Sequence, residues 1–76
     1  MIEKNNTNTK LELGKKIKKM RLSLGLSQKD LGDVLHIKYS TVCSWEKGHT
    51  APKISKIKQL AKFFNVTIDY LLGIED

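Results

Sequence analysis

The chain has 76 residues, of which 14 are lysine or arginine and 8 are aspartate or glutamate, giving a net charge of +6. This length accommodates one small domain and argues against an enzyme with a deep cleft between layers. No apolar run approaches the ~20 residues of a membrane span, and the first residues lack the hydrophobic stretch of a signal peptide. A single cysteine excludes an intrachain disulfide framework. We therefore expect a small basic cytoplasmic domain, with nucleic acid and anionic membrane surface as candidate partners.

The positive charge is concentrated in the first four fifths of the chain. Residues 1–62 carry a net charge of +9, whereas residues 63–76 contain three acids and no lysine or arginine. This polarity favours a binding face built from residues 1–62, although charge alone does not distinguish a nucleic-acid site from a lysine-rich surface.

The N-terminal part of the chain predicts a loose arm followed by a helix. Residues 1–8 are polar, and the folded domain is expected over residues 9–74. The pair Thr9 and Glu12 has the spacing of a capping box, which predicts that the first helix begins at Thr9. Gly25 is expected to end this helix. Its apolar stripe is predicted to comprise Leu13, Ile17, Met20 and Leu24.

A second, short helix is predicted after Ser27. Ser27 is a preferred N-cap residue, and Asp30 complements the positive end of the helix. The chain must turn sharply at His36, a residue type that tolerates positive φ better than most. The apolar side of this helix consists of Leu31, Val34 and Leu35.

A third helix is predicted over residues 39–47, ending at Gly48. The side chains expected to face inward are Ile37, Val42 and Trp45. The opposite side, projected at about 100° per residue, carries Ser40, Cys43, Ser44 and Lys47, with Tyr39 on the flank. This outward face has no apolar stripe, so we expect it to meet a polar partner or water.

The remaining chain predicts two further helices. Pro52 lies just before a fourth helix, Asn65 suits a left-handed C-terminal position, and Thr67 caps a short fifth helix that Gly73 ends. The apolar face of the fourth helix is predicted to be Ile54, Ile57, Leu60, Ala61 and Phe64. Its outer face carries Lys53, Lys56, Lys58 and Lys62. Five helices without strand alternation predict a compact all-α domain.

The second and third predicted helices have the properties of a helix-turn-helix. Their apolar residues form a closed set with Ile37 in the turn between them. Gly32 inside the second helix costs roughly 1 kcal/mol relative to alanine, which is understandable if the next helix crosses closely there. The third helix would then project outward at a steep angle.

The order and spacing of several motifs resemble the phage repressor/Cro type of helix-turn-helix domain, also known as the xenobiotic response element family. The motifs are L-G-L-S-Q-x-x-L-G, V-x-x-W-E-x-G, L-A-x-F-F-N-V and D-Y-L-L-G, and they lie between about residues 11 and 73. The resemblance implies a lambda repressor-like fold of five helices with a central helix-turn-helix.

The resemblance also implies which residues contact double-stranded DNA. Family members read base edges in the major groove at the positions of Tyr39, Ser40 and Ser44. Phosphate contacts are implied for Lys38, Thr41, Lys47 and Lys53. Gln28 occupies a position that either binds a phosphate or supports the reading helix.

Arg21 and Glu46 match a structural ion pair of the family, in which an arginine of the first helix holds the third helix. Arg21 is the only arginine in the chain, and its fork-shaped guanidinium suits a bidentate carboxylate pair. The sequence departs from the common family pattern at two positions. His36 stands where many relatives have glycine, and Lys38 stands where many have a capping serine or threonine.

These observations predict a sequence-specific DNA-binding transcriptional regulator, a repressor that binds a palindromic operator as a homodimer. One short helix reads too few bases for specificity, so two half-sites are expected. The predicted dimer contacts are Phe63, Ile68, Tyr70 and Ile74, with Phe63 equally compatible with a core position.

The sequence is compatible with other functions as well. The fold also suits a protein-interaction module such as an antitoxin, or the DNA-binding part of a longer repressor. A lipid-binding domain would need an exposed apolar helix face, which is not found before Phe63. No cofactor, metal or enzymatic activity is expected, because Cys43, His36 and His49 lack zinc-site spacing and no catalytic grouping stands out. We expect Cys43 to be an inert exposed thiol rather than a redox sensor.

Overall fold

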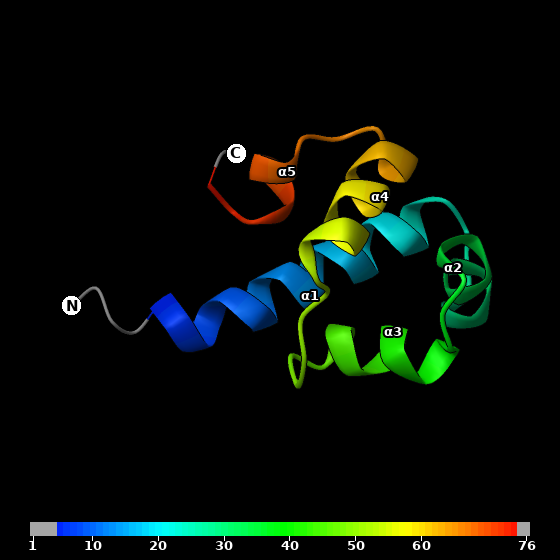
Figure 1. The fold of residues 1–76 in the computed structure, drawn as a ribbon, viewed down its shortest axis with the longest axis horizontal. Helices are drawn as coiled ribbons and strands as arrows, with labels where there is room; N and C mark the ends of the chain where they lie inside the picture. Colours follow the sequence, from blue (N-terminus) through cyan, green and yellow to red (C-terminus); the bar gives the residue numbers. More distant parts are fainter. Residues whose placement is uncertain (1–4, 75–76) are drawn as a thin grey trace.

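The computed structural model describes residues 5–74, and these form five helices joined by short turns (Figure 1). The helices are α1 (Asn5–Ser23), α2 (Gln28–Leu35), α3 (Tyr39–Glu46), α4 (Ile54–Phe64) and α5 (Ile68–Leu71). No strand occurs within this described range. The predicted all-α, five-helix fold is confirmed.

The first helix begins earlier than its capping signal predicts. α1 starts at Asn5, so Thr9 lies inside the helix and the predicted start at Thr9 is wrong. Neither glycine nor proline occurs before Gly14, so nothing in the backbone prevents the helix from extending backward through the polar residues. The division into an arm over 1–8 and a domain over 9–74 therefore overlaps α1. The flexibility of the arm stays a prediction, and residues 1–4 lie outside the described part.

The other helix ends follow the sequence closely. Ser27 and Asp30 form a reciprocal capping box on α2, with the Ser27 hydroxyl accepting from the Asp30 amide at 2.9 Å and the Ser27 amide donating to the Asp30 carboxylate at 3.0 Å. These bonds lower the pKa of Asp30, the backbone bond from Ser27 contributing most. Thr67 caps α5, and both His36 and Asn65 adopt the left-handed conformation after α2 and α4. Local side-chain chemistry thus determines these four boundaries.

The core is built from one side of each helix. The buried apolar side chains are Leu13, Ile17, Leu31, Leu35, Val42, Trp45, Ile57, Leu60, Ala61, Phe64 and Leu71. Three residues predicted to face inward are instead exposed. Leu24 is 53% exposed because α1 has already ended at Ser23, and Ile54 is 60% exposed because it begins α4, away from the other helices. Val34 is 41% exposed at the edge of the α2 stripe.

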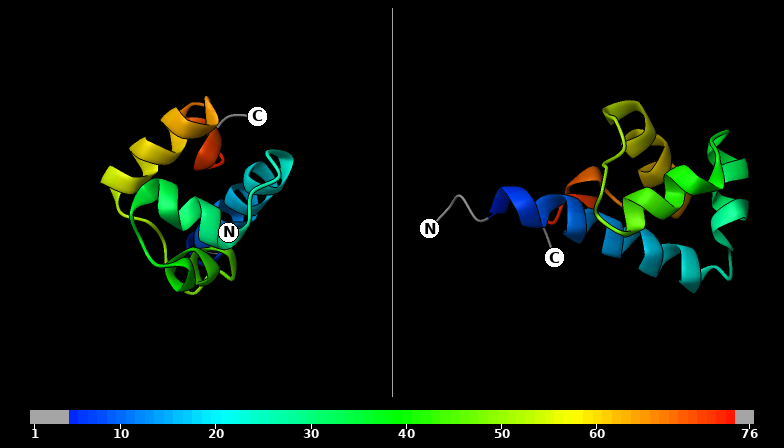
Figure 2. Two further views of the ribbon diagram at one scale, coloured as in Figure 1. Left: turned by 90° about the vertical axis from the view of Figure 1, so that its right-hand side faces the viewer. Right: turned by 90° about the horizontal axis from the view of Figure 1, so that it is seen from below.

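α3 packs against α1 and α2, whereas α4 contacts α2 and α5. In Figure 1, α3 lies along the lower edge of the molecule and α4 and α5 lie above it. The right-hand view of Figure 2 shows α1 as a long helix along one side of the molecule, with the other helices beside it. The α3 helix is therefore at the surface on one side while its other side contributes to the core.

His36 is the one residue of the turn before α3 that adopts positive φ, at 59°. A non-glycine residue in this conformation is strained by about 1–2 kcal/mol. We expect His36→Gly to raise the free energy of unfolding by about 0.5–1 kcal/mol, since glycine relieves the strain but adds backbone entropy. Urea denaturation measures this change.

The control for this prediction is His49→Gly, which replaces an exposed histidine that lacks a positive φ. This variant should lower stability or leave it unchanged. Equal effects of the two substitutions would show that the left-handed turn at His36 stores no strain.

Candidate nucleic-acid interface

The α2–turn–α3 unit presents one polar side of α3 to solvent. Val42 and Trp45 are buried on the inner side. On the outer side Ser40 and Lys47 are exposed, and Tyr39 at the helix start is 60% exposed. A large aromatic side chain with this exposure is available for a partner. Hydrogen-bonding and aromatic side chains are thus exposed on α3, the helix that lies along the lower edge of the molecule in Figure 1.

The beginning of α3 lacks a side-chain cap, as the lysine at position 38 predicts. Lys38 occupies the N-cap position in extended conformation, and its side chain makes no capping hydrogen bond. The amides of the first turn therefore depend on other acceptors. Lys38 is exposed, and Thr41 is half-buried with its amide donating to the Lys38 carbonyl at 3.0 Å. Lys53 is likewise an exposed, uncapped N-cap residue, in this case of α4.

Arg21 of α1 and Glu46 of α3 form a buried bidentate ion pair. Arg21 Nε lies 2.7 Å from Glu46 Oε2, and Arg21 Nη2 lies 3.0 Å from Glu46 Oε1. The two side chains are only 8% and 4% exposed. The hydrogen bonds that Arg21 donates to the Glu46 carboxylate raise the pKa of Arg21, although burial opposes this shift. This pair ties the last turn of α3 to α1.

The same network reaches the two neighbouring segments. Arg21 Nη1 donates to the carbonyl of Leu26 at 2.8 Å, just before α2. Gln28 Nε2 donates to Glu46 Oε1 at 3.0 Å. Of the two roles considered for Gln28, its side chain makes the contact that supports α3. One carboxylate consequently links α1, α2 and α3.

Two glycines allow the close approach of these elements, and only one of them was expected. A Cβ at Gly32 would lie 2.8 Å from the Ile37 carbonyl oxygen, so the turn, rather than the body of α3, requires glycine there. A Cβ at Gly14 would overlap the carbonyl oxygen of Trp45. Sequence reasoning missed Gly14, because the backbone of Trp45 that packs on it lies far along the chain, whereas Gly32 stands next to the turn that it contacts.

Thr50 is a second residue that sequence reasoning missed. Its hydroxyl lies 2.9 Å from the hydroxyl of Ser44, which sits half-buried on the outer side of α3. Thr50 belongs to the loop between α3 and α4, and this loop descends to the same edge as α3 in Figure 1. Only the fold brings these two hydroxyls together.

The four residues predicted to make dimer contacts differ in their exposure. Ile74 is 71% exposed, but Ile68 is half-buried and packs against the core. Tyr70 is half-buried, with the Lys16 ammonium 4.3 Å from its ring centroid. Phe63 is 38% exposed and stacks in a tilted arrangement on Phe64.

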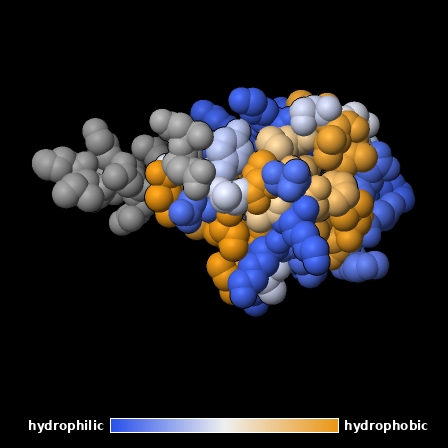
Figure 3. Space-filling model, turned by 90° about the horizontal axis from the view of Figure 1, so that it is seen from above, coloured by the Kyte–Doolittle hydropathy of each residue, from blue (hydrophilic) through white to orange (hydrophobic). Residues whose placement is uncertain are grey.

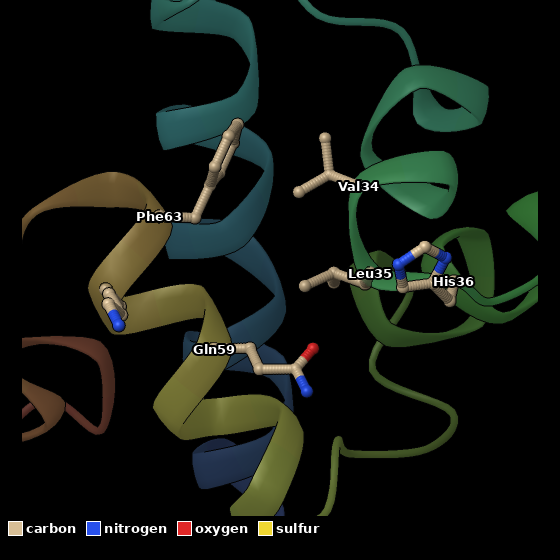
Figure 4. Close-up of a pocket in the computed structure, with 6 residues that line it drawn as sticks. Val34, Leu35, His36, Gln59 and Phe63 are labelled. Carbon is tan, nitrogen blue, oxygen red and sulfur yellow. The ribbon is translucent and has the colours of Figure 1, made fainter.

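Phe63 also lines an open groove of about 410 Å³ between α2 and α4. In Figure 4, Phe63 from α4 and Val34 from α2 point toward each other across this groove. The surface seen from above, on the side away from α3, contains a broad hydrophobic area beside hydrophilic side chains (Figure 3). Apolar side chains are thus exposed on the side of the molecule away from α3. Their exposure alone does not identify which surface would form a dimer.

Three further features of the described residues concern Cys43, the metal-binding residue types and the hydropathy of the helices. Cys43 is a free thiol and half-buried rather than exposed. Within residues 5–74, no three His, Cys, Asp or Glu side chains gather in a way that would hold a metal ion. None of the helices in this part of the chain combines the length and apolar character needed to cross a membrane.

Comparison with known proteins agrees with this geometry. Residues 17–71 match the helix-turn-helix family. The chain belongs to this family. The predicted resemblance to phage repressors is confirmed, because the fold superimposes on the P22 c2 repressor, solved in complex with a synthetic operator, with a TM-score of 0.77 and 27% identity. The match covers 83% of this chain and 96% of that one.

Two curated relatives of this helix-turn-helix chain are regulators of transcription. The chain is 33% identical over 87% of its length to the HTH-type transcriptional activator BcrR of Enterococcus faecalis. It is 30% identical over the same share to the HTH-type transcriptional regulator ImmR of Bacillus subtilis (strain 168). The matched segment spans 32% and 52% of these relatives' own lengths, so the similarity concerns their helix-turn-helix parts.

Proposed function

We propose that this chain binds double-stranded DNA in a sequence-specific manner and regulates transcription, with α3 inserted in the major groove. The observation that carries the proposal is the exposed polar side of α3, held from behind by the buried Arg21–Glu46 pair. Tyr39, Ser40 and Ser44 would contact base edges, since an α-helix fits the major groove and hydroxyl groups pair with either donors or acceptors there. The relatives and the operator-bound repressor support this assignment.

Phosphate contacts would fix the position of α3 on the duplex. Lys38 and Lys47 stand at the two ends of α3, and Lys53 begins the next helix. Thr41 adds a half-buried hydroxyl in the first turn. Lysine side chains and uncapped backbone amides are the usual partners of phosphate oxygens. These groups supply affinity without reading sequence.

We further propose that the protein acts as a homodimer on a palindromic operator and represses transcription. A single eight-residue reading helix contacts few base pairs, so a second copy is needed for useful specificity. The acidic C-terminal part, which contains Ile74, is the candidate for self-association because its charge does not favour DNA. Phe63 would contribute to the dimer interface only if the second copy reaches the groove between α2 and α4. Ile68 and Tyr70 would contribute only if it also contacts α5.

Two substitutions test the proposed division of roles. Tyr39→Ala should change the preferred bases, because the aromatic ring would pack on a base edge such as a thymine methyl. Lys47→Ala should weaken binding to all duplexes alike and reduce the slope of log K against log salt by about 1. Fluorescence anisotropy on a set of duplexes at several salt concentrations measures both effects.

The matched control is Lys62→Ala, which removes an equally exposed lysine from the groove between α2 and α4. This variant should leave the salt slope unchanged. If neither Tyr39→Ala nor Lys47→Ala affects DNA binding, or if the parent protein has no salt-sensitive affinity for DNA, the alternative of a protein-interaction module is favoured.

A further inference from the structure

The hydroxyl groups of Ser44 and Thr50 form a hydrogen-bonded pair that links α3 to the following loop. The two oxygens are 2.9 Å apart, and either group can be the donor. Ser44 is half-buried, whereas Thr50 is exposed. Ser44 therefore has a fixed neighbour on the side of the loop and not only solvent around it.

The backbone after α3 holds Thr50 in place. Gly48 turns the chain with φ of 79°, and its amide donates to the Trp45 carbonyl at 3.0 Å. The His49 amide donates to the carbonyl of Ser44 itself at 3.0 Å. On the far side of Thr50, Pro52 is buried. These contacts fix both ends of the short segment that carries the Thr50 hydroxyl.

Pairing with Thr50 limits what the Ser44 hydroxyl can offer to a base. A serine hydroxyl has one proton and two lone pairs, and it rotates to suit its partners. If Ser44 donates to Thr50, its oxygen can only accept, which suits the amino groups of adenine or cytosine. If Thr50 donates instead, Ser44 keeps its proton for guanine O6 or N7, adenine N7 or thymine O4, and it keeps one lone pair. In both cases the position taken by Thr50 is no longer available to a base, whereas a serine without this neighbour could turn all three of its hydrogen-bonding positions toward the DNA.

We propose that Thr50 is a specificity-determining residue that acts by positioning Ser44, because the hydrogen bond between the two hydroxyls occupies one hydrogen-bonding position of Ser44 and fixes where its remaining ones point. The proposal rests on the proposed function, because it requires that Ser44 faces a base edge. It adds a residue outside the helix-turn-helix to the groups that decide which sequence is bound. Thr50 itself touches Ser44 and need not touch a base.

The experiment compares Thr50→Val, Thr50→Ser and Ser44→Ala. Competition binding is measured on duplexes that carry each of the four bases at every position of the selected site. Thr50→Val should lower base discrimination by roughly two- to tenfold, the range of one neutral hydrogen bond, at the position that Ser44→Ala affects. Thr50→Ser retains the hydroxyl and should therefore keep the base preference of the parent protein. The double variant that combines Thr50→Val with Ser44→Ala should have the same base preference as Ser44→Ala alone, because the two residues act as a unit.

The control is Ser23→Ala, which removes another exposed hydroxyl with a local hydrogen bond, at the end of α1. It should leave base preference unchanged. An equal loss on all duplexes with Thr50→Val would overturn the proposal in favour of a phosphate contact, and no change at all would overturn it outright. If Ser44→Ala alters no preference while the parent protein still selects a site, this inference and the base contact assigned to Ser44 fail, whereas the proposed sequence-specific DNA binding stands. If the parent protein selects no sequence, the proposed function fails as well.

Discussion

Arg21→Ala is expected to lower the free energy of unfolding by about 3 kcal/mol, the range found when one partner of a buried ion pair is removed. The substitution leaves the Glu46 carboxylate, which is 4% exposed, with Gln28 as its remaining side-chain partner among those described. For a domain of this size the loss corresponds to a fall in melting temperature of roughly 12–24 °C. Thermal unfolding followed by circular dichroism measures it.

The matched control is Lys29→Ala, which removes one partner of the exposed Lys29–Asp33 pair. In that pair the side chains are 76% and 68% exposed, and Lys29 Nζ lies 3.2 Å from Asp33 Oδ2. Exposed pairs at this helical spacing contribute only about 0.3–0.5 kcal/mol. Similar losses for Arg21→Ala and Lys29→Ala would contradict the role assigned to the buried pair.

Gly14→Ala is expected to destabilise the protein by about 1–3 kcal/mol, the usual cost of overpacking. Helix propensity alone predicts the opposite sign, because alanine is favoured over glycine by about 1 kcal/mol inside a helix. The added methyl group would overlap the carbonyl oxygen of Trp45, which is backbone and cannot rotate away. The last turn of α3 must then move away from α1, so DNA affinity should fall at temperatures where the variant is still folded. Urea unfolding and binding measurements separate these two effects.

Lys15→Ala provides a comparison on the same helix, since Lys15 is the exposed neighbour of Gly14. It should leave the unfolding midpoint nearly unchanged. A stabilising effect of Gly14→Ala would mean that α1 and α3 are not as close as the structure has them, and the positioning of α3 would need another explanation.

The sequence is most informative where structure depends on local chemistry. The capping box of Ser27 and Asp30, the left-handed turns at His36 and Asn65, and the cap at Thr67 all involve neighbouring residues. Spacing also predicts the buried sides of α2 and α3, because helical periodicity decides which residues face the core. These signals are sufficient for the fold and for the outward side of α3.

Predictions fail where the outcome depends on contacts distant in sequence or on helix ends. Leu24 and Ile54 fit the apolar period, but they lie beyond or at the end of their helices and remain exposed. Gly14 and Thr50 matter only because the fold brings Trp45 and Ser44 against them. No local pattern contains this information. The helix of the site and the Arg21–Glu46 pair that holds it are therefore predictable from the sequence, whereas the contacts made by Gly14 and Thr50 emerge only from the structure.

The central claim is that α3 reads a specific sequence in double-stranded DNA, and selection of bound duplexes from a random pool tests it most directly. A salt titration on the selected duplex completes the measurement. The account predicts a palindromic sequence with half-sites about 10 base pairs apart from centre to centre, and an affinity that falls steeply as salt increases. Selection at low salt that enriches no sequence would contradict it.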